Sequence, residues 1–122
     1  MTPIVLIVDD DQQTLLLIEQ VLKTSNVSVI RAEDGAQALE VLEEMTPDVM
    51  LLDMLMPHVG GADVLQYVSQ TPRLDGMFVA IVSAHRQLAR ADEAARANAY
   101  LVKPIRPGDI REALSRALDQ DN

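Results

Sequence analysis

The sequence predicts an α/β fold in which a doubly wound parallel sheet is covered by helices on both faces. Short apolar runs of four to six residues alternate with longer amphipathic stretches along the whole chain. Charged side chains stand at the carboxyl ends of several of these runs. Strands that are buried on both faces are continuously apolar, and amphipathic stretches form the helices that cross between them. The alternation therefore indicates five parallel strands and five helices.

A strand followed by a helix is predicted at the beginning of the sequence. Residues 4–9 are apolar up to a terminal aspartate, which is typical of a buried strand. Residues 12–24 carry Leu15, Ile18 and Leu22 on one helical face. This helix is expected to pack that face against the sheet.

The next three predicted elements are a strand, a helix and a strand. Residues 27–32 alternate only in part between apolar and polar side chains, so this strand is expected nearer an edge of the sheet. A helix is expected to start at Asp34 and Gly35 and to end before Pro47, because the residue that precedes a proline disfavours helical backbone. Residues 48–53 form a third apolar run that ends in aspartate and predict a buried strand.

Another helix and strand follow a break in the chain. Pro57, Gly60 and Gly61 are turn-forming residues and mark that break. A helix is expected over residues 62–70, and residues 77–83 predict a fourth strand.

The last predicted elements are a helix, a strand and a helix. Residues 87–97 are rich in alanine and arginine and favour a helix, and residues 99–103 predict the fifth strand. The last helix has an apolar stripe at helical spacing, made of Ile110, Ala113, Leu114, Ala117 and Leu118. The flavodoxin-like strand order 2-1-3-4-5 fits this pattern, because it places the most apolar strands, the first and third, inside the sheet.

Composition limits the possible functions. The length suits a single domain, 1–122, and the absence of cysteine excludes disulfides and thiolate metal sites. The chain has two histidines, His58 and His85, which argues against a zinc site and suits surface loops. A net charge of −9 argues against direct nucleic-acid binding. No apolar stretch is long enough to span a membrane and no leader pattern opens the sequence, so a cytoplasmic location is expected.

Four charged residues follow predicted strands and are expected at one edge of the sheet. Asp9 and Asp10 close the first strand, Asp53 closes the third, and Lys103 closes the fifth. In doubly wound sheets, ligands bind outside the carboxyl ends of the strands where the strand order reverses, here between the first and third strands. The sequence therefore predicts a site that contains these residues.

The residue types at this edge suggest a divalent cation and a phosphoryl group. Clustered carboxylates repel one another, and a cation with oxygen ligands, such as Mg²⁺, relieves that repulsion. Asp9 and Asp10 are candidate ligands, and Asp53 could be a third ligand or a nucleophile that forms an aspartyl phosphate. Lys103 can balance charge on the phosphoryl oxygens, and Ser83, at the end of the fourth strand, can donate a hydrogen bond to one of them.

Each of these residues also has an ordinary structural interpretation. Asp10 or Asp11 could simply cap the following helix, Asp53 could be a turn residue, and Ser83 could bond locally. Lys103 is harder to explain in this way, because lysine is an unusual residue at the end of a buried strand unless it has a partner. The joint presence of polar groups at the ends of four strands favours the functional interpretation.

Four motifs occur together in a characteristic order. They are Val5–Asp11, Pro47–Pro57, Ile81–Ala84 and Tyr100–Pro104. Because of these motifs, the chain resembles the receiver domain of bacterial two-component response regulators. The resemblance covers essentially all 122 residues. The resemblance implies that the protein is phosphorylated as part of a phosphorelay. It would accept a phosphoryl group and would not be an enzyme, apart from catalysing its own phosphorylation and dephosphorylation.

The resemblance implies roles for the residues at the site. Asp53 corresponds to the phosphoacceptor, and Lys103 to the lysine that contacts the phosphoryl group. Asp9 and Asp10 correspond to the acidic pair that holds Mg²⁺, with Asp10 the direct ligand, and the backbone carbonyl of Leu55 corresponds to a third protein ligand besides Asp53. A cis bond is expected between Lys103 and the following proline.

The resemblance also implies a switch and partners. Ser83 corresponds to the hydroxyl that moves toward the phosphoryl group, and Tyr100 to the aromatic residue that turns inward after it. The surface formed by the helix expected over residues 87–97, the strand over residues 99–103 and the last helix would then change. The implied phosphoryl donor is a histidine kinase or a histidine phosphotransfer protein. A downstream output domain or protein and a weak homodimer are further possible partners.

The sequence departs from the family pattern in three places. Gly60-Gly61 replaces the usual Asp-Gly pair, which is expected to loosen the start of the third helix. Asn98 precedes Ala99 where a Gly-Ala pair is usual, and asparagine can adopt the left-handed conformation that glycine would supply. The stretch from Ser83 to Lys103 is about two residues short, so the length and position of the helix expected over residues 87–97 are open.

Two alternative functions are compatible with parts of this pattern. A receiver-like module could signal without phosphorylation, which Mg²⁺ binding and acyl-phosphate labelling would test. A small haloacid-dehalogenase-type phosphatase also uses an aspartate nucleophile with Mg²⁺. Its motif, Asp-x-Asp-x-Thr, fits Asp9 and Asp11, but Gln13 stands where threonine is needed and Thr14 comes one place late.

Overall fold

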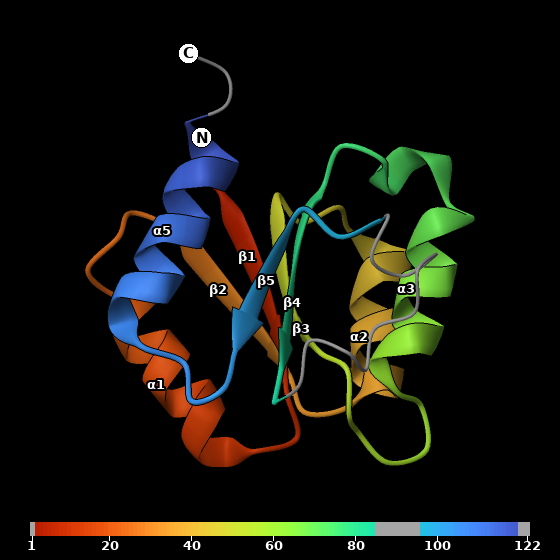
Figure 1. The fold of residues 1–122 in the computed structure, drawn as a ribbon. Coiled ribbons are helices and arrows are strands. Elements are labelled where there is room, and N and C mark those ends of the chain that lie inside the picture. Colours follow the sequence, from red (N-terminus) through yellow and green to blue (C-terminus); the bar gives the residue numbers. More distant parts are fainter. Residues whose placement is uncertain (1, 85–95, 120–122) are drawn as a thin grey trace.

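The computed structural model describes residues 2–84 and 96–119, and within them five parallel strands form one sheet. The strand order is β2-β1-β3-β4-β5, as predicted, with β2 at one edge (Figure 1). The strands are β1 (Ile4–Val8), β2 (Ser28–Ala32), β3 (Val49–Asp53), β4 (Phe78–Ser83) and β5 (Ala99–Val102). Strand order reverses between β1 and β3, whose carboxyl ends therefore flank the position where a ligand is expected.

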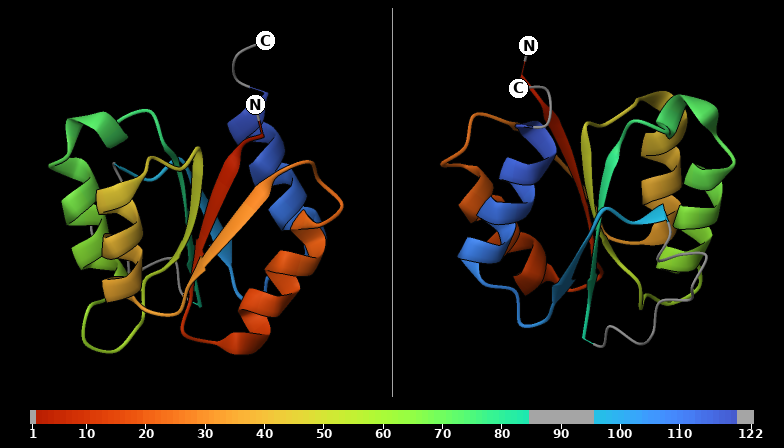
Figure 2. Two further views of the ribbon diagram at one scale, coloured as in Figure 1. Left: turned by 180° about the vertical axis from the view of Figure 1, so that it is seen from behind. Right: turned by 45° about the horizontal axis from the view of Figure 1, so that its top comes forward.

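Helices cover both faces of the sheet, with α1 and α5 on one face and α2 and α3 on the other (Figures 1 and 2). Their bounds are α1 (Gln12–Leu22), α2 (Gly35–Glu44), α3 (Gly61–Ser69) and α5 (Pro107–Leu118). A short 3₁₀ helix that was not predicted, η1 (Pro72–Leu74), joins α3 to β4. The helix predicted over residues 87–97 falls almost entirely on residues 85–95, outside the described part of the chain.

Side-chain caps explain where α1 and α2 begin. Asp11 accepts a hydrogen bond from the backbone N–H of Gln13, and Asp34 accepts one from the backbone N–H of Gln37. Each cap satisfies a backbone donor that has no partner within its own helix. The helices thus start directly after the turns that leave β1 and β2, close to the carboxyl edge of the sheet.

The sheet separates two apolar cores. Val5 and Ile7 belong to the core beneath α1 and α5, whereas Leu6 and Val8 belong to the core beneath α2 and α3. This follows from the alternation of side chains along a strand, with apolar groups on both faces of β1. The same alternation places Asp53 on the α1 and α5 side of the sheet.

Asn98, the residue that precedes β5, is hydrogen-bonded to β4. Its backbone N–H donates to the carbonyl of Val79 at 2.7 Å, and its side-chain Oδ1 accepts from the N–H of Val79 at 2.8 Å. The predicted left-handed conformation was wrong: in the described part of the chain, positive φ is found at His58 (65°) and at no glycine. Asparagine is therefore used here for its side-chain acceptor and not for its backbone freedom.

The start of α3 is capped although Gly60 has no side chain. The carboxylate of Asp63 accepts a hydrogen bond from the N–H of Gly60 at 3.1 Å, which compensates in part for the missing cap.

Among the described residues, no helix is long and apolar enough to cross a membrane.

Candidate functional site

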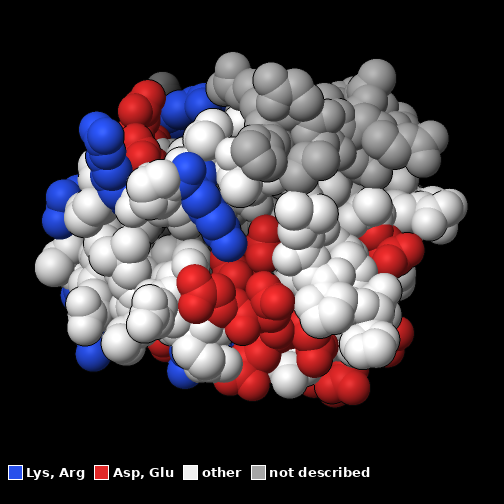
Figure 3. All heavy atoms as spheres, turned by 60° about the horizontal axis from the view of Figure 1, so that its bottom comes forward, with Lys and Arg blue, Asp and Glu red and all other residues white. Residues whose placement is uncertain are grey.

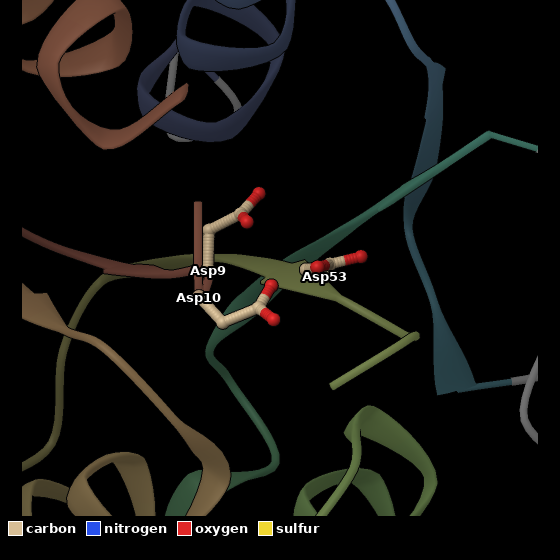
Figure 4. A group of neighbouring side chains, drawn as sticks. All are labelled: Asp9, Asp10 and Asp53. Carbon is tan, nitrogen blue, oxygen red and sulfur yellow. The ribbon is translucent and has the colours of Figure 1, made fainter. Parts of the chain in front are cut away.

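Three carboxylates meet at the carboxyl edge of the sheet (Figure 4). Asp9 follows β1 and Asp53 is the last residue of β3, while Asp10 is the next residue along the chain from Asp9. One carboxylate oxygen of each residue lies within 4.8 Å of the others. Asp9 and Asp53 are only 1% and 3% exposed, whereas Asp10 is exposed. The cluster therefore has a buried floor and a side that is open to solvent.

Lys103 balances part of this charge. Its Nζ lies 3.1 Å from Oδ2 of Asp9 and 3.6 Å from Oδ2 of Asp53. Burial alone would lower the pKa of Lys103, but the charge of Asp53 and the hydrogen bond to Asp9 outweigh burial, so its pKa is raised. Lys103 therefore stays protonated, and its bond to Pro104 is cis, as expected.

Backbone N–H groups orient two of the carboxylates. The N–H of Asp11 donates to Oδ1 of Asp9 at 2.9 Å, and the N–H of Leu55 donates to Oδ1 of Asp53 at 3.2 Å. Each buried carboxylate thus has one oxygen held by the backbone and one that faces Lys103.

Asp53 is the residue whose protonation the site perturbs most clearly. Burial raises its pKa, the neighbouring charge of Asp9 raises it further, and Lys103 and the N–H of Leu55 oppose this, so the pKa is about 6. Three carboxylates with one lysine leave an excess of negative charge, which a cation would neutralise. The all-oxygen donor set and the open side at Asp10 fit Mg²⁺, which prefers oxygen ligands and retains several waters.

Asp11 does not join the cluster. Its carboxylate accepts hydrogen bonds from the N–H of Gln13 and from the hydroxyl of Thr14, at 3.2 and 2.7 Å. These hydrogen bonds lower its pKa. The capping interpretation is thus correct for Asp11. The arrangement also argues against the phosphatase alternative, because that motif requires the aspartates of Asp9-x-Asp11 to act at the same site.

Ser83 and Tyr100 lie on the neighbouring strands β4 and β5. Ser83 ends β4, is 5% exposed, and its carbonyl accepts a hydrogen bond from the N–H of Lys103 at 2.9 Å. Tyr100 is paired in register with Ile81 of β4 and packs, half-buried, against the core beneath α2 and α3. Ser83 is therefore at the same sheet edge as the cluster, whereas Tyr100 lies three residues before Lys103, within β5.

A groove beside the cluster was not predicted from the sequence. It runs between the start of α1 and the chain that follows β5, and is lined by Asp11, Gln13, Thr14, Leu17, Lys103, Pro104 and Ile105. Periodicity identified the buried face of α1, but it does not show which loop lies opposite the exposed first turn. On the same end of the molecule, acidic side chains gather into one patch (Figure 3).

Comparison with known proteins identifies the family. The model of the response regulator receiver domain matches residues 5–115. NtrC of Escherichia coli K12, a DNA-binding transcriptional regulator, is 36% identical over 112 residues, which are 92% of this chain and 23% of NtrC. The chemotaxis protein CheY of Bacillus subtilis is 31% identical over 119 residues, which are 94% of this chain and 97% of CheY.

Solved structures show the same fold. The crystal structure of a putative response regulator from Chloroflexus aurantiacus has a TM-score of 0.88 and 28% identity, and covers 98% of this chain and 100% of that one. The chain spans less than a quarter of the larger curated relatives that it matches first. Since the match runs from β1 into α5, it includes every strand end that builds the acidic cluster, and the chain belongs to the family of response regulator receiver domains.

Proposed function

We propose that residues 1–122 form a single receiver domain that accepts a phosphoryl group on Asp53 from a histidine kinase or a histidine phosphotransfer protein. Members of this family are phosphoacceptors of two-component systems rather than enzymes. The observation that supports the proposal best is the geometry at Asp53. It is a buried carboxylate with two further carboxylates and a lysine around it, at the edge of the sheet where the strand order reverses.

In the proposed transfer, an Oδ atom of Asp53 attacks the phosphorus of a phosphohistidine. The new O–P bond forms as the N–P bond of the donor breaks, and the imidazole nitrogen leaves with the electron pair. Asp53 must be ionised to attack, and with a pKa of about 6 it is largely ionised at neutral pH. Lys103, 3.6 Å from Asp53, is placed to balance charge on the phosphoryl oxygens.

Asp9, Asp10 and Asp53, with the backbone carbonyl of Leu55, would hold Mg²⁺. The ion, when bound, supplies positive charge to the oxygens of the transferring group. The N–H of Leu55 keeps one oxygen of Asp53 oriented, so that the other remains available to the donor.

Phosphorylation is proposed to act on a surface through Ser83 and Tyr100. The hydroxyl of Ser83 would turn to the new phosphoryl oxygens, and Tyr100 would move into the space that Ser83 leaves. That change would alter the surface of β5, α5 and the helix expected over residues 87–97.

The proposed setting is the cytoplasm, where a kinase or phosphotransfer protein would be the donor. The readout would pass to an output domain or protein, or to a second copy of the domain in a weak homodimer. With a net charge of −9, the domain itself is not expected to bind nucleic acid or a membrane surface.

The decisive experiment is intact-mass analysis after incubation with Mg²⁺ and a small acyl phosphate. A single phosphoryl adduct is expected, lost in Asp53→Asn and in the presence of EDTA. Asp75→Asn serves as a control, because Asp75 is exposed and follows η1, away from the cluster. An adduct that persists in Asp53→Asn would reject this acceptor. If no donor labels the wild-type protein, signalling without phosphorylation becomes the better explanation.

A further inference from the structure

The loop between β3 and α3, residues 54–60, follows Asp53 directly and carries Leu55. The N–H of Leu55 donates a hydrogen bond to Oδ1 of Asp53, so the position of this loop determines part of the geometry of the site. Within the loop, His58 has a φ of 65°, in the left-handed region that is unfavourable for residues other than glycine. Strain of this kind persists only where contacts on either side hold the backbone in place.

The first contact that holds the loop is at its C-terminal end, where it meets Gly61, the first residue of α3. A Cβ at this position would lie 2.6 Å from Cα of Met54 and 2.7 Å from the carbonyl oxygen of Asp53. The N–H of Gly61 also donates to the carbonyl of Met54 at 3.2 Å. The end of the loop is therefore seated directly on the end of β3.

The second contact joins the loop to a different element. At Gly35, the first residue of α2, a Cβ would overlap the carbonyl oxygen of Val59 and lie 2.6 Å from its Cγ1. The nearest atom belongs to the backbone, so a side chain at position 35 cannot be accommodated by a rotamer change alone. The first turn of α2 is thus the surface against which Val59 rests.

This turn of α2 is itself firmly held. Asp34 accepts hydrogen bonds from the N–H of Gln37 at 2.8 Å through its side chain, and from the N–H of Ala38 at 3.1 Å through its carbonyl. Shortly before the helix, the carbonyl of Ala32 accepts from the N–H of Asp9 at 3.2 Å. The turn that supports Val59 is therefore tied to the strand end that carries Asp9.

We propose that Gly35 is a positioning residue for the phosphoryl-acceptor site. The missing side chain at Gly35 lets Val59 seat against α2, which sets the 54–60 loop and with it the N–H and carbonyl of Leu55 relative to Asp53. The inference rests on the proposed function, in which that carbonyl is a ligand of Mg²⁺. It gives Gly35 a role at the site although it contacts neither the phosphoryl group nor the ion.

The test compares Gly35→Ala with Gly108→Ala. Both glycines lie in the first turn of a helix, where alanine is normally the better helix former, but a Cβ at Gly108 meets nothing within 4 Å. Gly35→Ala is expected to weaken Mg²⁺ binding by about tenfold, the loss typical when a group that supports a metal ligand is removed. Calorimetric titration with Mg²⁺ measures this, and the amide shift of Leu55 in NMR spectra reports the loop directly. Gly108→Ala should match the wild type in both.

A second variant covers the case in which Gly35→Ala does not fold. Val59→Gly removes the Cγ1 contact with Gly35 and frees the loop, so it should also weaken Mg²⁺ binding. A folded Gly35→Ala, or a folded Val59→Gly if the first does not fold, that binds Mg²⁺ as the wild type does would overturn the inference. If the wild type itself neither binds Mg²⁺ nor is labelled, it is the proposed function that fails.

Discussion

At the scale of single residues, the triplet Asp9, Asp10 and Asp11 shows what a sequence can and cannot predict. A run of aspartates after an apolar strand indicates a site, and two of the three do meet Asp53. The third, Asp11, turns to the hydroxyl of Thr14 and caps α1. The difference depends on how the backbone turns out of the strand into the helix, which residue type alone does not determine.

Leu55 offers a prediction at this scale. Its side chain is 58% exposed, two residues after the proposed acceptor, and it cannot hydrogen-bond a water molecule that attacks the aspartyl phosphate. We expect the phosphorylated state to be long-lived. Leu55→Asn should shorten its lifetime by about two- to tenfold, which is the effect of one additional hydrogen bond in the transition state of hydrolysis. A time course of the phosphorylated mass after removal of the donor measures it, with Leu55→Met as the apolar control. Equal lifetimes for Leu55→Asn and the wild type would contradict the expectation.

At the scale of elements, the strands were predicted to within one residue at each end, because β1, β3 and β4 are buried apolar runs that a polar residue closes or follows. The 3₁₀ helix η1 was not predicted, because a turn of three residues that begins with a proline has no apolar periodicity. The guanidinium of Arg73, in η1, donates hydrogen bonds to the carbonyls of Leu42 and Met45. These residues are too far away in the sequence for a local pattern to predict the contact. Long-range polar contacts of this kind stabilise turns that periodicity cannot identify.

Asn98 leads to the prediction at this scale. Removing its side-chain oxygen leaves the N–H of the buried residue Val79 without that acceptor, which costs about 1–3 kcal/mol of the free energy of unfolding. Asn98→Ala and Asn98→Gly should both destabilise the domain in urea unfolding, with glycine the worse of the two because it gains more freedom when unfolded. Asn98→Asp keeps the acceptor oxygen and should retain most of the stability. If Asn98→Gly proved as stable as the wild type, the side-chain hydrogen bond would be unimportant.

At the scale of the whole molecule, the acidic cluster links stability to pH. The pKa of Asp53 is raised from 3.8 to about 6, so between these values the folded protein binds more protons than the unfolded chain. The stability that this group contributes is therefore present at low pH and lost as the pH rises through about 6. The cluster that could be predicted from strand ends is thus also a source of instability when no cation is bound.

The corresponding prediction concerns unfolding without Mg²⁺. Between pH 4 and 7, the contribution of Asp53 to the free energy of unfolding should fall by at most about 3 kcal/mol, because its pKa is raised from 3.8 to about 6. Urea unfolding across this range measures the fall, and it should be smaller in Asp53→Asn and when Mg²⁺ is added. An identical pH dependence in Asp53→Asn and the wild type would show that other groups are responsible.

Asp53, the proposed acceptor, ends β3, and the lysine that balances its charge follows β5, where its backbone N–H donates a hydrogen bond to the carbonyl of Ser83 at the end of β4. During synthesis, Asp53 leaves the ribosome well before Lys103 does. A nascent chain, or one cut before β5, would carry the acceptor without the lysine that balances its charge. The compensating charge at Asp53 would then be acquired only when the last strand joins the sheet, so the charge-balanced site is complete only once β5 is in place.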